Sequence, residues 1–354
     1  MTEMVLMKGN EAVAEAAILA GCRYYFGYPI TPQNEISEYM AKRMPEVGGV
    51  FLQAESELAA INMVYGAAGA GGRVMTSSSS PGISLMQEGL SYLAAAELPC
   101  VVINMMRGGP GLGGIQPSQA DYFQAVKGGG HGDYHLVVLA PATIQEMIDL
   151  TIEAFDIADN YRVPVMVLGD GMLGQMMEAV NLRLPRKIPA TSKSWATTGA
   201  KGRARNIITT LYLDPAELEK HNLRLQEKYV WLKEREVRYE ELNCEDAEII
   251  IVAYGTTSRI ARTAIKNARA EGIRVGLLRP ITLWPFPAKA FKEILERGAK
   301  AFLCIEMSAG QMVEDVRLAV DGKAPVYFYG RTGGVVPNPR EVLEEIKKVS
   351  QGER

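Results

Sequence analysis

The first half of the chain alternates short apolar runs with segments whose apolar residues recur at helical spacing. Most of the apolar runs do not alternate with polar residues, which is typical of strands covered on both faces. Between them lie helical patterns such as Asn10–Gly21, Leu58–Ala70 and Thr143–Asn160. This order predicts a doubly wound, mostly parallel α/β sheet. The predicted strands are Tyr24–Tyr28, Val50–Gln53, Arg73–Thr76, Cys100–Met106, Leu136–Ala140 and Val163–Leu168.

A second, smaller α/β pattern begins near residue 247. Its predicted strands are Glu248–Tyr254, Arg274–Leu278, Ala301–Glu306 and Val326–Tyr329, and its predicted helices are Ser258–Ala270, Ala288–Arg297, Met312–Val320 and Arg340–Val349. The two patterns predict a domain over residues 1–185 and another over 246–354, which agrees with about 150 residues per domain in a chain of 354.

Residues 186–245 are expected to link the two domains. The stretch Leu184–Gly202 has no clear period and is rich in Pro, Lys, Ser and Thr, as a crossing segment would be. Pro215–Leu242 is dense in Glu, Lys and Arg and predicts a long charged helix. We interpret its charges as a solvated face, with docking to a partner as the alternative.

Composition narrows the class of protein. Hydrophobic residues make up 47% of the chain, charged residues 22%, and the net charge is −3, so a globular protein is expected and nothing favours binding to nucleic acid. No apolar run approaches the roughly 20 residues that span a bilayer, so no membrane contact is expected. The N-terminal stretch Met1–Lys8 lacks a signal or transit pattern, which predicts a cytoplasmic protein.

The cysteines and histidines offer little material for a metal site. Cys22, Cys100, Cys244 and Cys304 are scattered with no CxxC pair, so the chain has no local ligand set for zinc or an iron–sulfur cluster. We expect all four to be reduced structural cysteines. Only three histidines exist, and no metal ligand is predicted in this chain.

Polar residues follow four successive predicted strands of the first domain. Ligands of open α/β sheets bind beyond the carboxyl ends of the strands, so these residues should meet at one rim. The four segments are Pro29-Ile30-Thr31-Pro32, Ala54-Glu55-Ser56-Glu57, the serine run Ser77–Ser80 with Pro81 and Gly82, and Arg107 with the glycines at 108, 109 and 111. Together they bring a hydroxyl, carboxylates, serines and a guanidinium to a candidate ligand site.

Each of these features also has a structural interpretation. Thr31 before Pro32 suits a helix N-cap, and Glu57 in a first helical turn complements the helix dipole. The serine run suits a turn, and the glycine-rich loop after Arg107 suits either a lid or a flexible connection. Arg107 itself is expected to be paired or to face a ligand, because a charge at the end of an apolar strand needs a partner.

The tripeptide Gly169-Asp170-Gly171 resembles the beginning of the thiamin diphosphate motif, in which an Asp and an Asn pair hold Mg²⁺. Here a single Asn181 follows only ten residues after Gly171, and no Asn pair follows. We therefore predict a turn at Asp170 rather than a magnesium ligand.

The rim motifs resemble the alpha subunit of the 2-oxoacid:ferredoxin oxidoreductases. The matching stretches include Tyr28–Pro32, Glu55–Ala60, Thr76–Gly82, Arg107–Gly114, Gln119–Tyr122 and Asp170–Gln175. The stretches Tyr254–Thr257 and Leu278–Pro287 resemble the transketolase C-terminal domain. The resemblance implies a thiamin-diphosphate-binding-type domain, called the pyrimidine domain, followed by a transketolase C-terminal-like domain. It is strongest to the branched-chain (2-oxoisovalerate) enzyme, and the 2-oxoglutarate enzyme is nearly as similar.

The resemblance also implies a division of labour. The family oxidatively decarboxylates a 2-oxoacid to acyl-CoA and CO₂ and reduces ferredoxin. Thiamin diphosphate would be shared with a beta subunit that carries the diphosphate motif and Mg²⁺. A gamma subunit and a ferredoxin-like delta subunit would complete the complex, coenzyme A would be a co-substrate, external ferredoxin would take the electrons, and iron–sulfur clusters would lie on partner chains only.

The same resemblance assigns roles to residues at the rim. Glu57 would be the acid beside N1′ of the aminopyrimidine, with Glu55 as the competing candidate. Thr31 would donate to the carboxylate or carbonyl of the substrate, Arg107 would neutralise the carboxylate, and both would take part in catalysis. The remaining cofactor-binding residues would be Pro29, Ile30, Ser79, Ser80 and Gly82. Two other classes stay open: a 2-oxoacid dehydrogenase that passes acyl groups to lipoamide, and a non-catalytic subunit.

Overall fold

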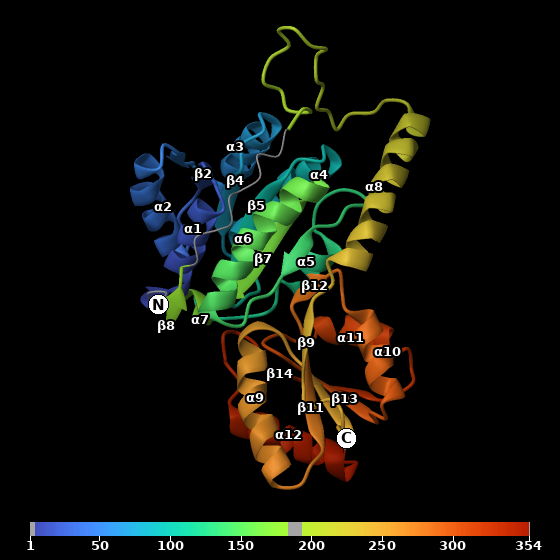
Figure 1. Cartoon of the computed structure of the whole chain (residues 1–354). Coiled ribbons are helices and arrows are strands. Elements are labelled where there is room, and N and C mark those ends of the chain that lie inside the picture. Colours follow the sequence, from blue (N-terminus) through green and yellow to red (C-terminus); the bar gives the residue numbers. More distant parts are fainter. Residues whose placement is uncertain (1–3, 183–192, 354) are drawn as a thin grey trace.

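The computed structural model describes residues 4–182 and 193–353 and contains two open sheets, one above the other in Figure 1. The first sheet has seven strands in the order β12-β6-β7-β5-β4-β2-β3. All neighbouring pairs are parallel except β12 with β6. Its strands are β2 Tyr24–Gly27, β3 Val50–Gln53, β4 Val74–Ser78, β5 Cys100–Met106, β6 Val137–Leu139, β7 Pro164–Asp170 and β12 Thr282–Trp284.

Helices cover both faces of this sheet, so the predicted doubly wound α/β fold is confirmed. The central strands β4, β5, β6 and β7 are buried along their whole length, as their continuous apolar sequences require. Helix α1 packs against both α2 and α6, and α3 packs with α4. The helices are α1 Gly9–Leu19, α2 Asn34–Glu46, α3 Glu57–Gly69, α4 Ser80–Ala95, α5 Tyr122–Lys127, α6 Ile144–Tyr161 and α7 Gly171–Gln175.

The second sheet has five strands in the order β14-β13-β10-β11-β9. Helices α9 and α12 pack together, as do α10 and α11. The strands are β9 Tyr239–Leu242, β10 Ile249–Val252, β11 Val275–Pro280, β13 Ala301–Glu306 and β14 Val326–Gly330, and the helices are α8 Pro215–Arg235, which precedes this sheet, α9 Gly255–Ala270, α10 Ala288–Glu296, α11 Met312–Val320 and α12 Pro339–Gln351.

Two strand assignments differ from the sequence prediction. The charged helix predicted over Pro215–Leu242 ends at Arg235, and Tyr239–Leu242 is strand β9, antiparallel to β11. Thr282–Trp284, which lies in the motif attributed to the second domain, forms β12 at the edge of the first sheet. Both strands form through pairing with distant segments, which local patterns do not reveal.

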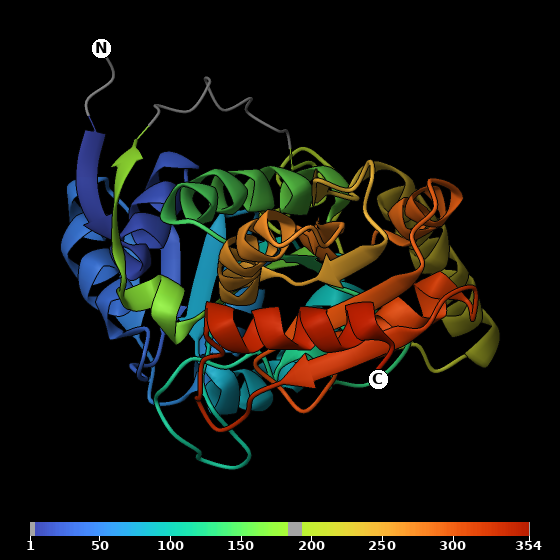
Figure 2. The same cartoon turned by 90° about the horizontal axis from the view of Figure 1, so that it is seen from below.

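A further antiparallel pair, β1 Met4–Lys8 with β8 Met177–Asn181, was not predicted and is visible side by side in Figure 2. Residues 184–192 of the predicted crossing segment 184–202 lie outside the described residues. Residues 193–213 run from there to α8 without a helix or strand. Among the described helices, none combines the length and the apolar character that crossing a bilayer requires.

The predicted structural role of the cysteines is confirmed, because Cys22, Cys100, Cys244 and Cys304 are free thiols buried in the protein. Burial raises the pKa of Cys22 and of Cys100 to about 12. Thiols held in this way are poor nucleophiles at neutral pH.

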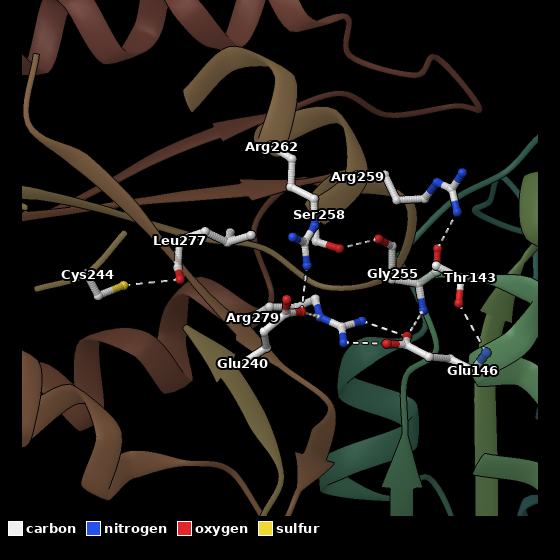
Figure 3. Close-up of polar contacts among 11 residues, drawn as sticks. Thr143, Glu146, Glu240, Cys244, Gly255, Ser258, Arg259, Arg262, Leu277 and Arg279 are labelled. Atoms are coloured by element: carbon white, nitrogen blue, oxygen red, sulfur yellow. Dashed lines mark hydrogen bonds and ion pairs between the residues drawn. The ribbon is translucent and has the colours of Figure 1, made fainter. Parts of the chain in front are cut away.

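Arg279 joins the two sheets through a buried ion-pair network (Figure 3). Its guanidinium donates to both carboxylate oxygens of Glu146, at 2.8 and 2.7 Å, and its Nε lies 2.8 Å from Glu240. Glu146 also accepts a hydrogen bond from the backbone N–H of Ala142 at 2.7 Å. Because Glu146 lies in the first turn of α6, this network fixes the second sheet against the carboxyl edge of the first.

Candidate active site

Glu57 is the first residue of α3 and is buried, with 5% of its surface exposed. The preceding Ser56 caps the helix, because its hydroxyl accepts a hydrogen bond from Ala59 N at 3.2 Å. The Glu57 carboxylate accepts a hydrogen bond from the Ser78 hydroxyl at 3.1 Å. Glu55, the competing candidate, is exposed. Of the two acids, only Glu57 occupies the buried, hydrogen-bonded position that a catalytic carboxyl group needs.

Gly82 makes room for this carboxylate. A Cβ at position 82 would lie 2.2 Å from Glu57 Oε1 and 2.0 Å from Ser78 Oγ, well inside contact distance. Gly82 belongs to the first turn of α4, so the helix backbone passes directly against the carboxylate. Glycine at this position is therefore a steric requirement of the Glu57 site rather than a requirement of the turn.

The serine run connects Glu57 to Arg107. Ser78 contacts Glu57, and the Ser80 hydroxyl accepts a hydrogen bond from Arg107 N at 3.0 Å. Ser79, between these two serines in the sequence, is fully buried, and its hydroxyl has no hydrogen-bond partner among the described residues. A buried hydroxyl without a partner is uncommon in folded proteins.

Arg107 is buried, with 7% of its surface exposed. Its guanidinium donates to the carbonyl oxygens of Thr31 and Leu112, each at 2.9 Å, while its Nε has no partner in the part of the chain that the structure describes. Within residues 4–182 and 193–353, no carboxylate lies at ion-pair distance from Arg107. Since a guanidinium carries five N–H donors, several remain for an oxyanion.

Asp121 supports this arrangement and was not singled out by sequence reasoning. It accepts hydrogen bonds from the Ser80 hydroxyl at 2.6 Å and from Asn104 Nδ2 at 2.9 Å. Burial raises the pKa of Asp121, although these two hydrogen bonds oppose the rise. The only signal in the sequence was its place in the stretch Gln119–Tyr122, which carries part of the family resemblance.

Two cavities open along the rim, and they separate the two predicted substrate-binding side chains. One, of about 570 Å³, is lined by Ser80, Arg107 and Asp121 together with residues of the second sheet's loops at 307–311 and 332–333. The other, of about 650 Å³, is lined by Thr31 with α2, α7 and residues 115–117. Thr31 therefore meets Arg107 through its backbone carbonyl, and its side chain faces a different cavity. Glu57 does not line either of these two cavities.

Two of the predicted cofactor-binding residues make few contacts. Pro29 is exposed and Ile30 is partly buried in the loop after β2. Ile30 accepts a backbone hydrogen bond from Gln33 N at 3.0 Å, which closes a turn. Pro29 and Ile30 therefore belong to a turn, and neither has a polar side chain that could contact a ligand.

Asp170 caps the short helix α7, as the sequence analysis predicted for a turn. Its Oδ1 accepts hydrogen bonds from Met172 N at 2.9 Å and Leu173 N at 3.2 Å. Burial raises the pKa of Asp170, and these backbone donors oppose the rise. The Asp170 carboxylate is thus engaged in capping α7.

Gln119 ties the loop after β5 to the second sheet. Its Nε2 donates to Tyr254 O at 2.9 Å, and its Oε1 accepts from Met307 N at 2.9 Å. The end of the loop that carries Arg107 is therefore attached to the second sheet, while residues 109–116 are exposed.

Comparison with known proteins shows which families and relatives this chain resembles. Residues 15–241 match the family described as pyruvate flavodoxin/ferredoxin oxidoreductase, thiamine diphosphate-binding, and residues 247–342 match pyruvate:ferredoxin oxidoreductase core domain II. A ketoisovalerate oxidoreductase subunit VorB from Methanothermobacter thermautotrophicus is 56% identical over 353 residues, covering 99% of this chain and 98% of the relative. A 2-oxoglutarate synthase subunit KorA of the same organism is 40% identical over 380 residues, covering 99% and 100%.

A solved structure has the same overall fold. The 2-oxoglutarate:ferredoxin oxidoreductase from Magnetococcus marinus, with 2-oxoglutarate, coenzyme A and succinyl-CoA bound, superimposes with a TM-score of 0.87 at 29% identity. The match covers 98% of this chain and 65% of that chain, so this chain spans about two thirds of that relative's length.

Proposed function

This chain belongs to the 2-oxoacid:ferredoxin oxidoreductase family, and on that premise we propose that it is the pyrimidine-domain subunit of an enzyme that oxidises 2-oxoisovalerate. The observation that carries the chemistry is the buried Glu57 carboxylate at the start of α3, hydrogen-bonded to Ser78. The choice of substrate rests on the relative named for ketoisovalerate, whose 56% identity exceeds the 40% of the relative named for 2-oxoglutarate.

The residues at the rim fit the aminopyrimidine half of thiamin diphosphate. Glu57 offers a buried carboxyl group. Because Gly82 has no side chain, the backbone of α4 lies directly against this carboxyl group. The Ser79 hydroxyl is buried and unpartnered among the described residues. Such a set suits a planar nitrogen heterocycle that exchanges a proton with a carboxyl group.

Bound thiamin diphosphate would supply a nucleophilic carbon and an electron sink for loss of CO₂. Glu57 would hold a proton at N1′ of the pyrimidine, and Ser78 would keep the carboxyl group oriented. Arg107 would pair with the carboxylate of the 2-oxoacid through N–H groups that the carbonyls of Thr31 and Leu112 do not use. The Thr31 carbonyl would hold the guanidinium in place for this contact, because Thr31 itself lines a different cavity from Arg107.

The remaining components of the reaction would come from partner chains. We propose a beta subunit that binds the diphosphate and Mg²⁺, because Asp170 of this chain is engaged in capping α7. A gamma subunit and a cluster-bearing delta subunit would complete the complex, with coenzyme A as co-substrate and external ferredoxin as acceptor. The relative from Methanothermobacter thermautotrophicus is itself named as a subunit, and the neighbour from Magnetococcus marinus contains coenzyme A.

The test is the substrate preference of the anaerobically purified complex. Coenzyme-A-dependent viologen reduction is measured with 2-oxoisovalerate, 2-oxoglutarate, pyruvate and indolepyruvate. We expect the highest kcat/KM with 2-oxoisovalerate. A preference for 2-oxoglutarate would overturn the substrate assignment. A complex that lacks clusters and transfers acyl groups to lipoamide would overturn the proposed reaction.

A further inference from the structure

Hydrogen bonds join four buried side chains of the first sheet and α2, which we call the Tyr25 network. The hydroxyl of Tyr25 on β2 lies 2.8 Å from Ser37 Oγ on α2 and 2.7 Å from Ser77 Oγ on β4. Ser77 donates to Oε1 of Gln33, the residue before α2, at 2.5 Å. Tyr25, Gln33 and Ser77 are fully buried, and Ser37 is buried as well. The Tyr25 network therefore connects β2, β4 and α2 with the loop that follows β2.

Each hydroxyl of the Tyr25 network donates in the same direction. A serine hydroxyl has one proton, and Ser77 gives it to Gln33, so Ser77 must accept from Tyr25. Tyr25 in turn must accept from Ser37. Burial raises the pKa of Tyr25, so its hydroxyl keeps the proton that it donates. Hydrogen bonds arranged in series in this way strengthen one another, and the series ends on the amide of Gln33.

Gln33 connects the Tyr25 network to the backbone of the loop 28–33. Its Nε2 donates to Tyr28 O at 3.4 Å, and its backbone N–H donates to Ile30 O at 3.0 Å. Because Tyr28 and Ile30 precede Thr31 and Gln33 follows it, these bonds close the loop around Thr31. The direction of the Thr31 carbonyl therefore depends on the position of Gln33.

The Thr31 carbonyl is the better fixed of the two carbonyls that hold the Arg107 guanidinium. The other one belongs to Leu112, which is 80% exposed in the glycine-rich loop. Thr31 O, at 2.9 Å from Arg107 Nη1, belongs to the loop that Gln33 closes. A guanidinium bonded to one packed carbonyl and one exposed carbonyl takes its orientation mainly from the packed one.

The end of β4 serves both groups of the candidate site. Ser77 and Ser78 are its last two residues, and successive side chains of a strand point to opposite faces of the sheet. Ser78 donates to Glu57. On the other face, Ser77 leads through Gln33 to the loop that holds Arg107. One strand end thus fixes the carboxyl group and the guanidinium relative to each other.

We propose that Tyr25, Ser77 and Gln33 are positioning residues for substrate binding. Through the Thr31 carbonyl, the Tyr25 network orients the Arg107 guanidinium for the carboxylate of the 2-oxoacid. This inference rests on the proposed function, in which Arg107 binds that carboxylate. Because the three residues act through Arg107, their loss weakens substrate binding more than it slows turnover.

The test compares variants of the purified complex by steady-state kinetics with 2-oxoisovalerate. Tyr25→Phe removes one hydroxyl and keeps the ring, which stacks on Phe51 with centroids 5.7 Å apart. Gln33→Met removes the amide at the end of the network and keeps a side chain of similar length. Tyr39→Phe is the matched control, because the hydroxyl of Tyr39 on α2 donates to Glu15 at 3.1 Å and has no link to the rim.

We expect Tyr25→Phe and Gln33→Met each to raise KM about two- to tenfold, as for the loss of one neutral hydrogen bond, with kcat nearly unchanged. Tyr39→Phe should change neither constant. In an Arg107→Met background, Tyr25→Phe should raise KM no further, because the group that it positions is gone. Where Arg107→Met itself raises KM, a natural KM in both single variants would overturn the proposal, as would equal effects of Tyr25→Phe with and without Arg107.

A second measurement does not depend on turnover. Phenylglyoxal reacts with guanidinium groups, and mass spectrometry gives the rate at which Arg107 is labelled in the purified full chain without substrate. This rate should rise about two- to tenfold in Tyr25→Phe and in Gln33→Met, while the exposed Arg274 is labelled equally in all variants.

An unchanged labelling rate of Arg107 in both variants would overturn the positioning role. If Arg107→Met left KM unchanged, the proposed function of Arg107 in substrate binding would fail instead. The labelling rate alone would then decide whether the Tyr25 network positions the guanidinium.

Discussion

The Glu57 carboxylate and the Ser78 hydroxyl are joined by a hydrogen bond of 3.1 Å across the carboxyl ends of two helix-covered strands. Ser78 is the last residue of β4 and Glu57 the first residue of α3. The contact forms because Gly82 brings α4 against both groups without a side chain. The end of β4 and the first turns of α3 and α4 therefore all contribute to the surroundings of the Glu57 carboxyl group.

Gly82→Ala should displace Glu57. The new Cβ would overlap Glu57 Oε1 and Ser78 Oγ, so the carboxylate must move and its contact with the cofactor must change. We expect kcat to fall at least tenfold, with weaker thiamin diphosphate binding by calorimetry. Gly114→Ala is the matched control, because a Cβ there meets no atom within 4 Å. Equal activity of the two variants would show that the packing around Glu57 does not matter for turnover.

Arg107→Met should raise KM more than it lowers kcat. The substitution removes the buried guanidinium that has no carboxylate partner among the described residues, and with it the proposed bond to the substrate. A hydrogen bond to a charged group contributes about 1.5–3 kcal/mol, which corresponds to roughly a ten- to hundredfold rise in KM. Arg107→Lys should restore substrate binding only in part, since lysine keeps the positive charge but lacks the paired N–H donors with which a guanidinium binds a carboxylate. Unchanged steady-state kinetics in both variants would remove Arg107 from the substrate site.

Arg279→Met should destabilise the protein by about 1.5–3 kcal/mol, because it removes a buried guanidinium that is hydrogen-bonded to the carboxylate of Glu146 and paired with Glu240 (Figure 3). Arg274→Met is the control: Arg274 pairs with Glu248 at the surface and is 58% exposed, so its loss should cost less than about 1 kcal/mol. Urea unfolding of both variants measures the difference. Equal midpoints would contradict a structural role for the buried network.

His135 should make stability depend on pH. Burial lowers the pKa of His135 to about 4, assisted by nearby Lys233, while its ring stacks on Trp284 at 4.4 Å. The folded state therefore binds fewer protons than the unfolded state, whose histidine titrates near pH 6.5. The contribution of His135 to the free energy of unfolding is fully present above about pH 6.5 and is lost as the pH falls toward about 4. After allowance for its partial exposure, we expect the loss to be about 2 kcal/mol.

The measurement is the free energy of unfolding between pH 7 and pH 4.5. His135→Phe keeps the stacking on Trp284 and should flatten the profile. His131→Phe, at an exposed histidine, should leave the slope of the natural chain in place. A steep slope that persists in His135→Phe would assign the acid sensitivity to other groups.

The order of the main elements follows from the sequence because buried parallel strands need continuous apolar runs. Strand β5, for example, lies where the run Cys100–Met106 predicts it. The charges of Glu240 and Glu241 continue the pattern of α8 and therefore predict helix where the structure has strand β9. In the structure, Glu240 pairs with Arg279 on the neighbouring strand β11 and with Arg262 on α9. Partners so distant in sequence leave no local pattern.

The sequence predicts which segments form the candidate site, but it does not predict how their side chains are arranged. Parallel topology indicates that the ends of neighbouring strands share a rim, and the structure agrees. Which acid is buried depends on packing: Glu57 lies under α4, while Glu55, two residues earlier, is exposed. The cavity lined by Arg107 is completed by loops of the second sheet, whose position the sequence does not reveal. The support that Asp121 receives from Ser80 and Asn104 depends on how three segments of the first domain pack together.

The most direct test of the account compares Glu57→Gln with Glu55→Gln in the purified complex. Both substitutions remove one carboxylate, two residues apart at the beginning of α3, but only Glu57 is buried and bonded to Ser78. The account predicts that Glu57→Gln abolishes coenzyme-A-dependent viologen reduction with 2-oxoisovalerate in a fully assembled complex, while Glu55→Gln stays near the natural rate. Near-natural turnover in Glu57→Gln would contradict it.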